Sequence, residues 1–141
     1  MLRGIRITYL CHDDDVIQLQ IVADNGRFRG TTRVYAGIGE LSDIAESLRG
    51  FPEDPYDKRQ VMFGQFGRKM AGGAVRLRLY CRDMAGHPVI EVRLEGDYTA
   101  PYVAETTTAF LDFEPAALDV FLQELPKLEK QFSGYAALAI G

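Results

Sequence analysis

The chain has 141 residues, of which 47% are apolar and 26% charged, a composition typical of one folded domain over residues 1–141 and not of a disordered chain. Its 16 Lys and Arg against 20 Asp and Glu leave a net charge of −4, which argues against a nucleic-acid binder. The first residues do not resemble a signal peptide, and no apolar run approaches the roughly 20 residues of a membrane helix. With two cysteines and no export signal, we expect a cytoplasmic protein with reduced thiols and no membrane partner.

Alternation of apolar and polar residues predicts three strands in the first part of the chain. One covers residues 4–11, and the next two flank the pair Asn25-Gly26. That pair suits a two-residue type I′ turn, because both central residues of such a turn need positive φ. Pairing across the turn sets Ala23 opposite Phe28 and gathers the apolar side chains on one face.

Two helices are predicted, separated by four further strands. Apolar residues recur at helical spacing over residues 38–48 and in a terminal helix that begins near Pro115. Pro126 lies inside the terminal helix, and we expect it to kink or split that helix. The last strand pattern covers residues 102–113. The tail, residues 135–140, is apolar enough that we expect it to pack on the chain's own sheet or on a twofold-related copy.

The two middle strands of this second group form a predicted hairpin around the turn at residues 83–88. If Met84 faces Val89 across the turn, Arg78 meets Glu95, which places opposite charges side by side.

The predicted order is therefore β-β-β-α-β-β-β-β-α, and short hairpin connections imply antiparallel pairing. We expect an α+β fold with one mainly antiparallel sheet of about six or seven strands, packed by two amphipathic helices. The terminal helix is expected to cover the buried face of the sheet, formed by Ile17, Leu19, Ile21, Val34, Val75, Leu77, Leu79, Ile90, Val92 and Leu94.

Sequence motifs of common enzyme classes are absent, including the GxxxxGK phosphate loop, HExxH and GxSxG. The glycine-rich basic segment 67–73 could hold an anion, but it precedes a strand and not a helix. Cys and His are ligands that zinc accepts, yet Cys11, His12, Cys81 and His87 lack the short spacing of a zinc site. We therefore predict no bound metal and no cofactor.

Two sets of charged residues are candidates for binding. Acidic residues in the first hairpin loop and in the first helix could face a protein partner: Asp13, Asp14, Asp15, Glu40, Asp43 and Glu46. Arginines on the polar phase of their strands could hold an anion or another ligand: Arg29, Arg33, Arg76 and Arg78. A salt-bridged outer face of a sheet is the plainer interpretation of these arginines.

Two segments carry a resemblance to a known family. Residues 86–94 (GHPVIEVRL), followed by residues 113–118 (FEPAAL) and a leucine-rich helix, resemble the small β-rich immunity proteins of bacterial polymorphic toxin systems, including the wall-associated-protein type. The resemblance implies a non-catalytic protein that binds and blocks a toxin domain, for which an acidic surface would suit a basic nuclease. It assigns no role to any single residue.

Three function classes follow from these observations. A non-catalytic cytoplasmic protein that binds a protein partner, such as an immunity-type protein or a homodimer, fits the missing catalytic motifs and the pI near 5.2. The alternative is a small-ligand-binding domain with a pocket between a curved sheet and the helices. An enzyme ranks third, because the sequence shows no paired general acid and base.

Overall fold

The computed structural model describes residues 3–67, 72–97 and 105–140. Ten elements follow one another in this part of the chain. They are β1 (Gly4–His12), β2 (Val16–Asp24), β3 (Arg29–Gly37), α1 (Glu40–Leu48), β4 (Arg59–Gly64), β5 (Ala74–Cys81), β6 (Pro88–Glu95), β7 (Thr106–Asp112), α2 (Pro115–Gln131) and β8 (Tyr135–Ala139).

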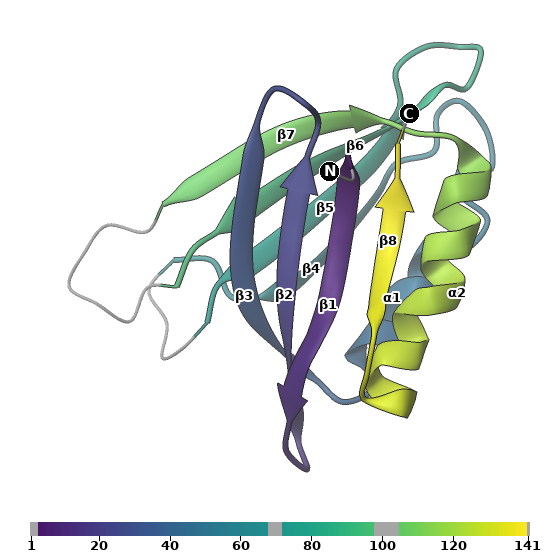
Figure 1. Ribbon diagram of the computed structural model, residues 1–141. Coiled ribbons are helices and arrows are strands. Elements are labelled where there is room, and N and C mark those ends of the chain that lie inside the picture. Colours follow the sequence, from purple (N-terminus) through teal and green to yellow (C-terminus); the bar gives the residue numbers. More distant parts are fainter. Residues whose placement is uncertain (1–2, 68–71, 98–104, 141) are drawn as a thin grey trace.

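The strands form two antiparallel sheets of four, in the orders β3-β2-β1-β8 and β4-β5-β6-β7, which we call the first and the second sheet. The α+β class and the antiparallel pairing are confirmed, but the expectation of one sheet of six or seven strands is wrong. The chain changes sheet after β3, because α1 and the following loop carry it to β4. Figure 1 shows the two sheets layered, with α2 alongside β8 at one side.

The residues predicted to share a buried face are all buried, with at most 3% of any of them exposed. They divide between the inner faces of the two sheets, which pack against each other. The expectation that the terminal helix covers this face is therefore wrong. Instead α2 packs on β8 and α1, and Leu118, Phe121 and Leu125 close one side of the core.

The β2–β3 hairpin turns over four residues and not over two. Asn25 accepts hydrogen bonds through its Oδ1 from the backbone N–H groups of Arg27 (2.9 Å) and Phe28 (2.8 Å), and it does not adopt the positive φ of a type I′ turn. Ala23 consequently pairs with Gly30 and not with Phe28, whose side chain is 62% exposed. Since the register moves by two residues, each strand keeps its predicted inner face.

The β5–β6 register also differs from the prediction, here by four residues. Arg78 pairs with Glu91 and not with Glu95, and Val89 pairs with Tyr80. Alternation along a strand fixes which face a residue occupies, but it does not fix which residue lies opposite. The prediction that Arg78 pairs with a glutamate on the next strand was therefore right, but the glutamate is Glu91 and not Glu95.

Both helices form, and of the kink or split expected at Pro126 the split does not occur. α2 continues through Pro126 as one helix and is not split there. Leu125 and Leu128, on either side of the proline, are both buried in the core, and this packing offsets the hydrogen bond that Pro126 cannot donate. The strand expected over 102–113 begins as β7 at Thr106, while residues 102–104 lie outside the described residues.

The apolar tail packs on the chain's own sheet as β8, which pairs with β1. Ala136 and Leu138 are fully buried, and the Glu124 carboxylate on α2 accepts a hydrogen bond from the Ala137 N–H at the other edge of the strand (3.2 Å). Gly4 permits the pairing, because a Cβ at this position would clash with the Leu138 carbonyl oxygen.

A buried carboxylate joins the two helices. Glu129, near the end of α2, accepts hydrogen bonds from the backbone N–H groups of Gly39 and Ser42 and from the Ser42 hydroxyl. These N–H groups belong to the first turn of α1, where they have no partner within the helix. α1 lacks a side-chain cap from its own N-cap residue, Gly39, so the cap comes from α2.

We expect Glu129→Gln to lower the free energy of unfolding by about 2–3 kcal/mol, because hydrogen bonds to a buried charged group contribute more than neutral ones. Urea denaturation monitored by circular dichroism measures this change. Glu46→Gln is the matched control, since the Glu46 side chain is exposed on α1 and its contact with Arg49 contributes little. Equal effects of the two substitutions would contradict the capping role.

We expect Leu138→Ala to lower the free energy of unfolding by about 2–5 kcal/mol, because it leaves a cavity where β8 meets the core. Val120→Ala serves as control, because Val120 is half exposed on α2. Thermal and urea unfolding of both variants test the difference. A loss for Leu138→Ala no greater than that for the control would show that β8 does not pack stably on β1.

Candidate functional site

The outer face of the second sheet carries a cluster of cationic, aromatic and sulfur-containing side chains. The strand register brings these outward-facing residues together from four strands. We call them the arginine face: Met62, Arg76, Arg78, Tyr80, Glu91, Arg93 and Phe110. Met62 and Phe110 are 49% and 47% exposed, so the described part of the chain leaves them largely uncovered.

Two guanidinium groups share one carboxylate at the centre of this face. Glu91 contacts Arg76 at 3.0 Å and Arg78 at 3.6 Å. Only 13% of the Glu91 side chain is exposed, against 52% of the Arg78 side chain. One negative charge facing two positive charges leaves a local surplus of positive charge, although the whole chain is acidic.

The other guanidinium contacts on the arginine face differ from one arginine to the next. The Nε of Arg76 is buried and has no hydrogen-bond partner among the described residues. The Arg93 guanidinium lies over the ring of Phe66, 5.2 Å from its centroid, in a cation–π contact. Of the two arginines that contact Glu91, Arg78 has the more exposed side chain, at 52% against 25% for Arg76.

A hollow of about 470 Å³ adjoins the arginine face. It lies where β4 begins, so that β5 extends past the first residue of its neighbour. Its volume falls within the range of sites that bind small molecules. The hollow is lined by Lys58, Arg59, Gln60, Arg78, Leu79, Tyr80 and Glu91.

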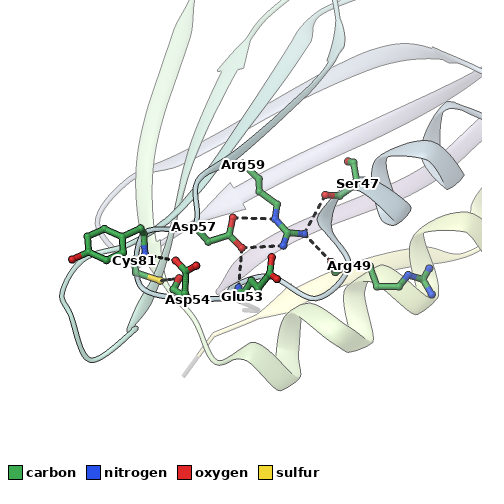
Figure 2. A network of polar contacts seen from close by, with 8 residues as sticks. Ser47, Arg49, Glu53, Asp54, Asp57, Arg59 and Cys81 are labelled. Atoms are coloured by element: carbon green, nitrogen blue, oxygen red, sulfur yellow. Dashed lines mark hydrogen bonds and ion pairs between the residues drawn. The ribbon is translucent and has the colours of Figure 1, made fainter.

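Arg59 is one of the residues that line the hollow, and Figure 2 shows the contacts of its guanidinium group. It donates hydrogen bonds to both carboxylate oxygens of Asp57, at 3.2 and 2.9 Å, and to the backbone carbonyls of Ser47 (3.3 Å) and Arg49 (2.7 Å) at the end of α1. Asp57 also accepts the Glu53 N–H at 2.8 Å. The Arg59 hydrogen bond lowers the pKa of Asp57. Arg59 is therefore a structural residue that joins α1 to the second sheet.

The structure does not bring the four predicted ligand-binding arginines together. Arg76 and Arg78 lie on the outer face of the second sheet, as predicted from their alternation. Arg29 and Arg33 lie on the outer face of the first sheet, on β3. Because the sheets pack through their inner faces, the two pairs point away from each other. Within the glycine-rich segment 67–73, positions 68–71 lie outside the described residues.

The predicted acidic site is brought together in part. The backbone N–H of Ile38 donates to the Asp15 carbonyl (3.1 Å), which places the β1–β2 turn beside the start of α1. Glu40 in the first turn of α1 accepts the Gly37 N–H at 2.8 Å. Asp13 accepts the N–H groups of Val16 and Asp15, and these bonds lower the pKa of Asp13.

The other predicted acidic residues are more dispersed. Asp14 is exposed at the tip of the β1–β2 turn and Asp43 on α1, while Glu46 lies near the far end of α1 and contacts Arg49 at 3.4 Å. Several carboxylates of this set thus contact groups in their own turn or helix, and the set does not form one continuous acidic patch.

The cysteines and histidines lie in separate local contacts. Cys11 donates to the Gln18 side chain (3.2 Å), and His12 stacks on Phe132 with ring centroids 3.7 Å apart. Cys81 lies 3.9 Å from a backbone carbonyl, and burial raises the pKa of its thiol. His87 contacts Asp83 at 2.7 Å in an exposed loop and lowers the pKa of that carboxyl. In the described ranges, no three His, Cys, Asp or Glu side chains are grouped so as to hold a metal ion.

Sequence reasoning missed the hollow and the apolar side chains that flank the arginines. Met62 and Phe110 alternate with buried residues along β4 and β7, and this period could have placed them on the outer face. Nothing in the sequence indicates that β4 starts opposite Leu79 and leaves Tyr80 without a pairing residue on β4.

No family model, curated protein or solved structure matches this chain. Neither α1 nor α2 combines the length and the apolar character needed to cross a membrane.

We expect Asp57→Asn to lower the free energy of unfolding by about 1–3 kcal/mol near pH 6, because it removes a charged, largely buried partner of Arg59. The folded-state pKa of Asp57 lies below 3.8, so its contribution is present above pH 3.8 and is lost as the pH falls through the folded-state value. The difference between wild type and variant should shrink below pH 3.8. Urea unfolding across this range measures it.

Asp112→Asn is the control for this prediction, since the Asp112 side chain is 67% exposed and 3.8 Å from Arg82. A pH-independent difference between Asp57→Asn and wild type would contradict the ion-pair explanation.

Proposed function

We propose that this chain is a non-catalytic binding protein that presents the arginine face to a protein partner. The single observation that carries the proposal is the composition of that face. Arginine, tyrosine, phenylalanine and methionine are the residues enriched at the centres of protein interfaces, where most of the binding energy resides. Here they lie together on the outer face of a regular sheet, where Met62, Arg78 and Phe110 are exposed and the tyrosine and the other arginines are partly exposed.

A small-ligand pocket between a sheet and the helices has less support. The core between those elements holds the side chains of Phe63, Phe121 and Leu125, each at most 1% exposed. A hollow beside the first turn of α2 and the end of β8 measures about 260 Å³, which is smaller than the hollow beside Arg78. The hollow beside Arg78 lies instead on the outside of the second sheet, open to a macromolecular partner.

We further propose that the partner is a toxin domain, as in immunity-type proteins. The segments that carry the resemblance become the β5–β6 loop with β6, and the junction of β7 with α2. β6 supplies Glu91 and Arg93 to the arginine face, so the resemblance and the candidate surface share a strand. A second copy of the chain is less favoured as the partner, because the apolar tail that suggested a homodimer packs as β8 on β1 of its own chain.

The test uses the protein encoded immediately upstream of this chain's gene. We expect that protein to contain a toxin domain, to bind the chain tightly in isothermal titration calorimetry, and to lose its toxicity when the two are co-expressed. Met62→Ser and Phe110→Ser should each weaken binding by about 10- to 100-fold, which corresponds to about 1.4–2.7 kcal/mol.

Val120→Ser on α2 is the matched control, because Val120 is exposed to a similar extent, at 51%. Thermal melts establish that each variant is folded. If the upstream gene encodes no toxin domain, the immunity-type proposal is wrong. If binding is insensitive to both face substitutions, the arginine face is not the interface.

A further inference from the structure

We infer that the partner segment recognised at the arginine face is acidic, and that one of its carboxylates enters the hollow and pairs with Arg78. This inference rests on the proposed function and adds the chemistry of the partner. The first observation that supports it is that Glu91 contacts Arg76 more closely than Arg78.

Glu91 is held mainly by Arg76. The Arg76–Glu91 contact is a hydrogen bond of 3.0 Å, whereas Arg78 lies 3.6 Å from the other carboxylate oxygen. Arg78 is also twice as exposed as Arg76, at 52% against 25% of the side chain. A guanidinium presents several N–H donors in one plane, so Arg78 can bind a second carboxylate while it stays near Glu91.

The lining of the hollow favours an anion. Lys58 adds a second cation beside Arg78, while Tyr80 and Gln60 supply neutral side chains that can donate hydrogen bonds. The charge of Arg59 is already matched by Asp57. An incoming carboxylate would therefore meet two cations and one carboxylate, which is a net attraction at the low dielectric of an interface.

The surroundings of the hollow favour a protein segment over a free anion or a nucleic acid. Phe110 lies opposite Glu91 on the neighbouring strand, two strand spacings from Arg78, which is about 10 Å. A segment in the polyproline II conformation rises about 3.1 Å per residue and repeats every three residues. A carboxylate at Arg78 and an apolar side chain three residues on, over Phe110, can therefore both face the sheet. A nucleic acid would place further phosphates near a chain of net charge −4.

The experiment compares two short fluorescent peptides on the full chain. One carries two neighbouring glutamates with a leucine three positions on, and the other has glutamine in place of both glutamates. We expect the glutamate peptide to bind roughly tenfold or more tightly at low salt in fluorescence anisotropy, and its affinity to fall as salt is added. This comparison needs no substitution in the protein.

Arg78→Gln should weaken binding of the glutamate peptide by about tenfold, while Arg82→Gln should leave it within about twofold. Arg82 is a matched control, since its side chain is 53% exposed and contacts one carboxylate, that of Asp112, at 3.8 Å. A single-stranded DNA oligonucleotide serves as the competing anion. Absence of binding by the glutamate peptide, equal binding of the two peptides, equal effects of the two substitutions or tighter binding of the DNA would each overturn the inference.

Failure of this inference is distinguishable from failure of the proposed function. If Met62→Ser and Phe110→Ser weaken the complex with the upstream gene product but Arg78→Gln does not, the face is an interface without an acidic anchor. If the peptide binds through Arg78 but none of the three substitutions weakens binding of the upstream gene product, the proposed function is wrong.

Discussion

Each sheet buries one of its faces against the other sheet. This burial divides the strand residues into an inward-facing group and an outward-facing group, which are under different physical constraints. Inward-facing side chains such as Leu19 and Leu77 are held in the core, so their identity is dictated by volume and hydrophobicity. Outward-facing residues have positions fixed by the same strands but no packing role that demands their type. The arginine face thus combines an accurate position with freedom of chemistry, which suits a binding surface.

Polar side chains from other elements protect the ends and edges of this framework. Glu129 satisfies the first turn of α1, and Glu124 accepts from the edge strand β8. The Asn25 side chain donates to the Phe110 carbonyl on β7, the outer strand of the second sheet (3.1 Å). Edge strands with unpaired groups invite added strands. Because α2 covers one edge and the β2–β3 turn contacts another, we favour recognition through a sheet face over strand addition.

Much of the fold could be predicted from the sequence because strand alternation reports directly on burial. It placed Val75, Leu77 and Ile90 in the core and put Arg76 and Arg78 on an outer face. Alternation has a period of two, so it cannot distinguish registers that differ by an even number of residues. Both hairpin errors were of this kind.

Other features depend on contacts between residues distant in the sequence. Alternation does not tell whether two sets of strands form one sheet or two sheets that face each other. For this reason a helix was predicted to cover the buried face of the sheet, where the structure has a second sheet. Similarly, the hollow depends on the Arg59 contacts with α1 and on where β4 starts, neither of which has a local signature. The composition of the candidate site was therefore partly predictable, but its shape was not.

The pairing of β1 with β8 has a consequence for how the protein is made. These strands lie at opposite ends of the described chain, and Figure 1 shows the two ends of the chain at the same end of the first sheet. During synthesis, the edge of β1 that will receive β8 therefore stays open until residues 135–139 have left the ribosome. Sheets closed by such distant contacts fold slowly, because the entropy of closing the long loop must be overcome first. We expect the β1–β2–β3 meander to form early and the first sheet to be completed only once β8 has been synthesised.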